Sequence, residues 1–174
     1  MTYYTSDKVL IRNLTEADAE IITREENAQG WVQTIDKYLM RLDHARQGKC
    51  ISLAAEYEGN VAGYVNVYPH PDSGPEALRA FPEIVDFAVL EKYRRRGIGS
   101  LLMDCAEKIA AGYADTVWLG VGLHAGYGSA QRMYVKRGYI PDGSGVWYEG
   151  RPCDPYGACV NDDDLNLFLS KKLR

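Results

Sequence analysis

Residues 84–109 constrain the fold more than any other part of the chain, because three local patterns follow one another there without a gap. Ile84 to Leu90 is almost continuously apolar, which predicts a strand covered on both faces. A basic turn with two glycines comes next. Apolar residues then recur at helical spacing: Ile98, Leu101, Leu102, Cys105 and Ile109. A strand, a turn and a helix in this order predict an α/β protein.

The turn between strand and helix has the chemistry of an anion-binding loop. Its sequence is Arg94-Arg95-Arg96-Gly97-Ile98-Gly99-Ser100. The two glycines carry no Cβ, so a ligand can approach the backbone amides closely. A helix that begins there adds unpaired N–H groups and the positive end of its dipole. These features predict a cradle for a pyrophosphate. The alternative is an ordinary turn with a solvated basic face.

This segment resembles the signature of the GCN5-related N-acetyltransferase (GNAT) family, which is Arg or Gln, two residues, Gly, one residue, then Gly or Ala. Arg94, Gly97 and Gly99 occupy those positions. The resemblance implies that residues 94–100 bind the pyrophosphate of acetyl-CoA. It also implies that backbone groups of the preceding strand meet the pantetheine and the acetyl group: Phe87, Ala88 and Val89.

Residues 130–141 (AQRMYVKRGYIP) are similar to the second motif of the family. By this resemblance the Tyr134 hydroxyl faces the coenzyme sulfur and serves as the general acid for the departing thiolate. The alternative is a core tyrosine on an amphipathic helix. Ala130 and Tyr127 then mark the cofactor-binding side of that helix. The family commonly has Asn where Tyr127 stands, so a cofactor contact must be lost or replaced.

Several carboxylates compete for the role of the general base. Glu83 opens the central strand, and the resemblance to the histone-acetyltransferase branch favours it. Asp86 lies within the strand pattern, where a desolvated carboxylate would be a stronger base. Glu56 and His124 are weaker candidates. By resemblance, the backbone N–H of Val89 would stabilise the oxyanion.

The rest of the chain predicts the elements around this segment. Apolar patterns predict helices over about 16–27, 34–47 and 129–137, and further strands over 9–14, 51–57, 61–67, 117–123, 146–148 and 165–169. Thr15 with Asp18 fits a capping box. Trp31 and Tyr38 are predicted either to contact substrate or to pack in the core. We therefore expect one N-acetyltransferase domain over 1–174, a GNAT-like α/β fold. Its mixed, mostly antiparallel sheet should have about six to seven strands, with helices on both faces.

Composition excludes several other classes. The net charge is −4, which argues against a nucleic-acid-binding protein. No apolar run is long enough to span a membrane, and no signal peptide is visible. Four cysteines at irregular spacing indicate a reducing cytoplasm. Residues 120–125 match the dinucleotide fingerprint G-x-G-x-x-A, but they lie in a strand pattern and not in a turn. No standard metal-ligand spacing occurs, so we expect no metal site.

Three functions remain open from the sequence. The first is an acetyl-CoA-dependent N-acetyltransferase that moves the acetyl group to a primary amine of a small molecule or a peptide by direct attack. The second is a non-catalytic acyl-CoA-binding regulatory module, which the replacement of Asn by Tyr127 and the uncertain base would fit. The third is a general nucleotide-phosphate binder, which would bind ATP about as well as CoA. Homodimers are common in the family, so the resemblance allows one here. Residues 149–164 are predicted to form a long loop, either a lid or a solvated segment.

Overall fold

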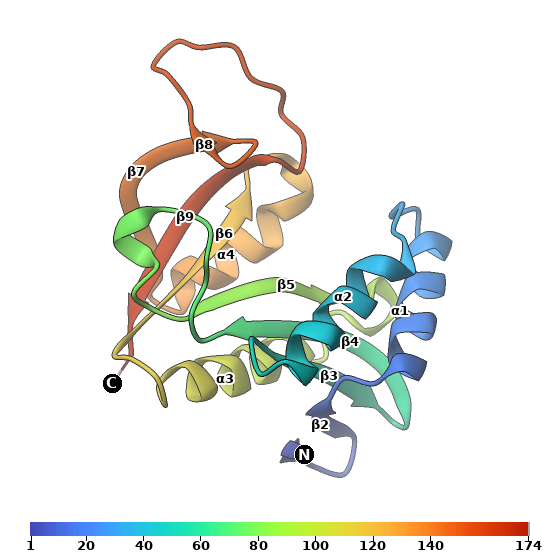
Figure 1. Ribbon diagram of the computed structural model, residues 1–174. Coiled ribbons are helices and arrows are strands. Elements are labelled where there is room, and N and C mark those ends of the chain that lie inside the picture. Colours follow the sequence, from blue (N-terminus) through green and yellow to red (C-terminus); the bar gives the residue numbers. More distant parts are fainter. Residues whose placement is uncertain (174) are drawn as a thin grey trace. The chain divides into compact units, whose positions relative to one another are not determined.

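The computed structural model describes residues 1–173, and within them lie four α-helices and nine strands (Figure 1). The helices are α1 (Glu16–Ala28), α2 (Ile35–Arg46), α3 (Ile98–Ala110) and α4 (Gly128–Lys136). The strands are β1 (Thr2–Thr5), β2 (Val9–Asn13), β3 (Ile51–Tyr57), β4 (Asn60–Tyr68), β5 (Glu83–Val89), β6 (Thr116–Gly122), β7 (Ile140–Tyr148), β8 (Arg151–Pro152) and β9 (Leu165–Lys172).

The strands pair in the order β1-β2-β3-β4-β5-β6-β9-β7-β8. The β5–β6 pair is parallel, whereas β1–β2, β2–β3, β3–β4, β6–β9, β7–β9 and β7–β8 are antiparallel. This confirms the predicted mixed, mostly antiparallel sheet. The strand count exceeds the predicted six to seven because β1 and β8 are short and lack an apolar alternation that would mark them in the sequence.

The Cα packing divides the chain into two compact units. The first comprises Met1–Pro69 and Ile84–Ile109, and the second comprises His70–Glu83 and the chain from Ala110 onward. Each unit is described by itself below. The assignment of one domain to residues 1–174 stays a prediction, and its last residue, Arg174, lies outside the described residues.

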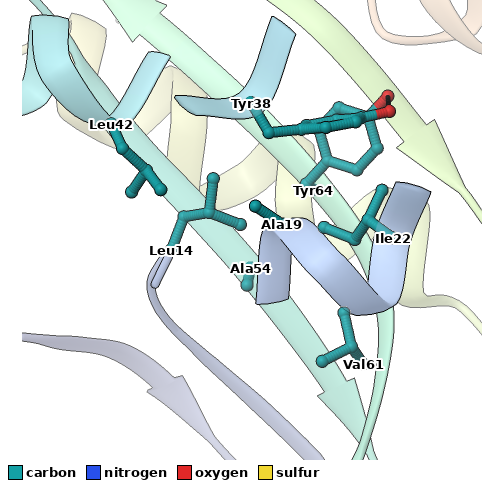
Figure 2. Packing of buried hydrophobic residues seen from close by; sticks show 8 residues of the cluster. All are labelled: Leu14, Ala19, Ile22, Tyr38, Leu42, Ala54, Val61 and Tyr64. Carbon is teal, nitrogen blue, oxygen red and sulfur yellow. Dashed lines mark hydrogen bonds between the residues drawn. The ribbon is translucent and has the colours of Figure 1, made fainter. Parts of the chain in front are cut away.

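In the first unit, α1 and α2 cover one face of β3 and β4, and their contact forms an apolar core (Figure 2). Thr15 caps α1 in the predicted capping box with Asp18. Tyr64 of β4 faces this core, so its neighbour Gly63 faces the other side of the sheet. There a Cβ built on Gly63 would lie 3.2 Å from Leu102 of α3. Helices therefore cover both faces of this part of the sheet.

In the second unit, the glycines of β6 allow aromatic rings to lie directly on the strand. A Cβ at Gly120 would lie 3.1 Å from the Phe168 ring, and one at Gly122 would lie 2.3 Å from the Tyr127 ring. Glycines in a strand allow such close packing because they carry no side chain. Trp118, fully buried, donates its ring N–H to the carbonyl of Phe81 at 2.9 Å. Its indole thus ties the 69–82 loop to β6.

Between residues 1 and 173, no helix combines the length and the apolar character needed to cross a membrane.

Candidate functional site

The end of β5 presents apolar residues that the first unit leaves incompletely covered. Ile84 is buried, but Phe87, Ala88 and Val89 are only partly buried. Full burial, as expected for residues 84–90, is therefore found at Ile84 and Leu90, whereas residues 85–89 between them are only partly buried. Ala88 approaches β4 closely, because a Cβ at Gly63 would lie only 2.6 Å from the Ala88 carbonyl oxygen. The three residues assigned to the pantetheine and acetyl group thus keep accessible surface.

The turn before α3 keeps its backbone amides available. Gly97 has φ +79°, a left-handed conformation that a residue without Cβ adopts at low cost. The first amide donor of the α3 ladder is Leu101, which bonds the Gly97 carbonyl at 3.1 Å. Within the described residues, none of the amides of 95–100 donates to a backbone carbonyl. Open amides at the start of a 13-residue helix can donate hydrogen bonds to an anion.

The three arginines of the turn are exposed, and two of them rest on aromatic rings. The Arg94 guanidinium lies 5.3 Å from the Trp31 ring centroid, and Arg96 lies 4.9 Å from that of Tyr57. Arg94 also donates to the Val89 carbonyl at 3.2 Å. These contacts hold the positive charges beside the open amides, where they add to the field of the helix dipole.

Asp86 does not continue the straight strand. Its φ is +52°, which places a kink in β5 just before Phe87. Its carboxylate accepts from Arg41 Nε at 2.7 Å and lies 3.9 Å from Lys37 Nζ. The side chain is 20% exposed. The desolvated carboxylate expected from the sequence is therefore paired with two cations from α2, at one turn's spacing on that helix.

Tyr134 lies on α4 in the second unit and is 5% exposed. Burial, with a smaller contribution from the Tyr127 hydroxyl, raises the pKa of Tyr134 well above its usual range. Its ring centroid lies 5.8 Å from that of Tyr139. A phenol in this environment stays protonated at neutral pH, as a general acid must before it acts.

Tyr127, at the position where the family commonly has Asn, belongs to a polar triad. Its hydroxyl donates to Asp163 Oδ1 at 2.8 Å, and His124 Nε2 lies 2.9 Å from the same oxygen. His124 Nδ1 accepts from the amide of Gly126 at 3.0 Å. The ring therefore donates from Nε2, which makes His124 a structural partner of Asp163 and occupies both of its nitrogens. The 149–164 loop thus supplies Asp163 to the start of α4.

The remaining candidates occupy separate places. Glu83 begins β5 and pairs with Trp118 of β6, both in the second unit. Glu56 is held by Arg12, which also binds Asp18, so it belongs to an ion-pair cluster at β2 and β3. Ala130 is partly buried on the first turn of α4. Across residues 1–173, no three His, Cys, Asp or Glu side chains gather in a way that could hold a metal ion.

Comparison with known proteins gives a family match and similar folds. A model of the acetyltransferase (GNAT) family matches residues 14–139. The chain is 27% identical over 108 residues to the N-alpha-acetyltransferase of Sulfurisphaera tokodaii. That alignment covers 59% of this chain and 64% of the relative, so it spans less than two thirds of the relative's length.

Two solved structures are similar over nearly the whole chain. Ard1 from Thermoplasma volcanium is 20% identical, with a TM-score of 0.70, and the match covers 96% of this chain and 99% of that one. The protein yncA of Salmonella typhimurium, described as an acetyltransferase and solved with its cofactor acetyl-CoA, is 16% identical. Its TM-score is 0.68, and the match covers 97% of this chain and 95% of that one. At these identities the likeness concerns the fold.

Proposed function

Because the chain belongs to the acetyltransferase (GNAT) family, we propose that it transfers the acetyl group of acetyl-CoA to a primary amine. One observation supports this most strongly: the backbone amides of residues 95–100 remain open at the start of α3. A diphosphate would accept from these amides and meet the positive end of the helix. We assign the pyrophosphate to Arg94, Arg95, Arg96, Gly97, Ile98, Gly99 and Ser100, and the pantetheine arm to Phe87, Ala88 and Val89. Tyr127 and Ala130 are the remaining proposed cofactor contacts.

The reaction needs three operations on protons and charge. The amine must lose a proton before it attacks, since a free alkylammonium has a pKa of roughly 10. The carbonyl oxygen then needs a donor, which we assign to the backbone N–H of Val89. The C–N bond forms and the C–S bond breaks, and Tyr134 gives its proton to the departing thiolate. The burial that keeps Tyr134 protonated supports this role.

For the base we retain Asp86 and Glu83. Asp86 directly precedes the proposed acetyl-binding residues, and the kink at φ +52° turns the backbone there. Its ion pair with Arg41 holds the carboxylate in one place. Glu83 opens the same strand but belongs to the second unit. Asp86→Asn and Glu83→Gln, compared at several pH values, assign the role, because only loss of the base removes the acidic limb of the rate profile.

For the acceptor we propose the α-amine of a peptide. The relative from Sulfurisphaera tokodaii is an N-alpha-acetyltransferase, a name that refers to this class of amine. Two aromatic side chains of the α1–α2 region, Trp31 and Tyr38, were candidates for substrate contact. Tyr38 is 1% exposed and packs in the core. Trp31 is partly buried and stays a candidate.

The test measures the release of CoA thiol from acetyl-CoA with short peptides of varied first residue. The matched panel contains the same peptides with a blocked α-amine and an internal lysine, together with a polyamine. We expect turnover only where the α-amine is free. Turnover with the polyamine and none with the peptides would overturn the acceptor assignment. Acetyl-CoA binding without thiol release from any amine would overturn the enzymatic proposal.

The second candidate is a non-catalytic acyl-CoA-binding module. One observation favours it: the Tyr127 hydroxyl is engaged by Asp163, and no amide occupies the position that Asn commonly has in the family. Under this proposal the protein binds acetyl-CoA and transfers nothing. Tyr127→Asn should then create turnover, whereas an enzyme that already works with Tyr127 would gain none.

A further inference from the structure

Helix α1 carries a buried carboxylate that the proposed reaction does not use. Glu26 is 1% exposed. One of its oxygens accepts from the Tyr38 hydroxyl, and the other accepts from the Tyr64 hydroxyl at 2.9 Å. No lysine or arginine among residues 1–173 forms an ion pair with it. A buried carboxylate is usually paired with a cation, and here two phenols take that place.

The two phenols are not equivalent. Figure 2 shows the Tyr38 and Tyr64 rings side by side with their oxygens together, and these oxygens are 3.3 Å apart. Tyr64, unlike Tyr38, is hydrogen-bonded to a side chain nearer the surface, because Lys37 Nζ donates to the Tyr64 hydroxyl at 3.3 Å. The same Nζ lies 3.9 Å from Asp86 Oδ1. Hydrogen bonds thus connect Lys37 through Tyr64 to Glu26, and an ion pair connects Lys37 to Asp86, entirely within the first unit.

Further charged and aromatic groups of α2 and β4 border the path from Asp86 to Glu26. Arg41 of α2 pairs with the other Asp86 oxygen at 2.7 Å and donates to Tyr68 of β4 at 2.6 Å. Lys37 also lies 5.3 Å from the Tyr38 ring centroid. Burial, with smaller contributions from Glu26 and Tyr38, raises the pKa of Tyr64 well above its ordinary value. Tyr64 therefore stays protonated at neutral pH.

We propose that Glu26 stores the proton that the acceptor amine loses, and that Lys37 and Tyr64 carry it there from Asp86. This inference rests on the proposed function. Tyr64 gives its proton to Glu26 as it accepts one from the Lys37 ammonium. The neutral Lys37 amine then accepts the proton that Asp86 has taken from the ammonium of the acceptor. Glu26 becomes neutral, and the other three groups return to their starting states. After transfer, the proton leaves to solvent along the same groups, since the Lys37 side chain is 28% exposed.

Glu26 and Tyr64 are positioning residues in this scheme, because they act through Asp86. The chain offers a matched pair for the test, Tyr64→Phe and Tyr38→Phe. Each variant removes one phenol that donates to Glu26, but only Tyr64→Phe cuts the link to Lys37. We expect kcat at neutral pH to fall about tenfold or more in Tyr64→Phe and in Glu26→Gln, with the loss recovered at high pH. Tyr38→Phe should stay within about twofold of the wild type, and KM for acetyl-CoA should not change.

Equal pH profiles for Tyr64→Phe and Tyr38→Phe would overturn the relay while leaving the acetyltransferase proposal intact. A second variant does not depend on a foldable Glu26 mutant. Lys37→Met cuts the relay at a partly exposed side chain. Its kcat should fall at neutral pH and recover at high pH, as in Tyr64→Phe. An unchanged kcat in Lys37→Met would refute the transfer through Lys37 and Tyr64.

Discussion

The close approach of β4 to β5 at Gly63 allows a quantitative prediction for Gly63→Ala. The added Cβ would lie 2.6 Å from the Ala88 carbonyl oxygen, 3.2 Å from Val89 Cα and 3.2 Å from Leu102 Cδ1. Ordinary contact begins at 3.4 Å, so relief at the carbonyl requires a shift of about 0.8 Å (3.4 minus 2.6). Two of these three neighbours are backbone atoms, which cannot rotate away.

Overpacking of this kind costs about 1–3 kcal/mol, and backbone neighbours place Gly63→Ala in the upper half of that range. Alanine also lowers the conformational entropy of the unfolded chain, which offsets about 0.4–1 kcal/mol of this destabilisation. We therefore expect a net loss of about 2 kcal/mol, measured as a lower urea midpoint. With a slope of about 2 kcal/mol per M, the midpoint falls by about 1 M. Affinity for acetyl-CoA should fall as well, because Ala88 and Val89 are the residues displaced.

Gly128→Ala is the matched control for Gly63→Ala. Gly128 has φ −57° at the first turn of α4, and an added Cβ would meet nothing within 4 Å. The same chemical change should therefore stabilise the protein by about 0.4–1 kcal/mol. If Gly63→Ala has the same urea midpoint as the wild type while Gly128→Ala is stabilised as expected, the contact between β4 and β5 at Gly63 is not as close as described.

Three further predictions concern the site and its supports. Tyr134→Phe should lower kcat about a hundredfold with little change in acetyl-CoA affinity. The control is Tyr139→Phe, because Tyr139 is a second buried tyrosine beside Tyr134. Equal losses of kcat in the two variants would remove Tyr134 from the mechanism. Gly97→Ala should weaken acetyl-CoA binding about tenfold, because φ +79° costs an L-residue about 1–2 kcal/mol, and calorimetry on both proteins checks this. For Asp18, burial opposes ionisation, but hydrogen bonds from Arg12 and Thr15 outweigh it and lower the pKa. Because the pKa of Asp18 is lower in the folded state, its ionised carboxylate stabilises the protein above about pH 4, and this stabilisation is lost as the pH falls through the folded-state pKa. In urea denaturation, Asp18→Asn should therefore be less stable than the wild type at pH 7 and nearly equal to it at about pH 2–3.

Local patterns were sufficient to predict most of the helices and strands. The helix over 34–47 was predicted from apolar spacing, and α2 spans Ile35–Arg46. The strand over 61–67 became β4, Asn60–Tyr68. Such patterns report on the chain's own periodicity, so they need no knowledge of distant partners. β7 was the least well predicted, because its first half holds Pro141, Gly143 and Gly145, which are atypical of strands.

Partners far apart in the sequence could not be predicted. Glu26 and Tyr64 are separated by 38 residues and Arg41 and Asp86 by 45. The spacing of Lys37 and Arg41 placed them on one side of α2, but nothing local indicated that this side faces Asp86. The Asp163 contact to Tyr127 spans 36 residues and was hidden in the same way.

The sequence by itself determined the strand, the glycine turn and the helix start around residues 84–110, because these elements lie within a few residues of each other and their geometry is local. Only the tertiary structure decided which groups surround each acidic side chain. Asp86 pairs with two cations, Glu56 pairs with Arg12, and Glu26 accepts from two phenols. The physical reason is that the charge state and reactivity of a carboxylate depend on the groups within a few ångströms, and folding brings those groups from other elements.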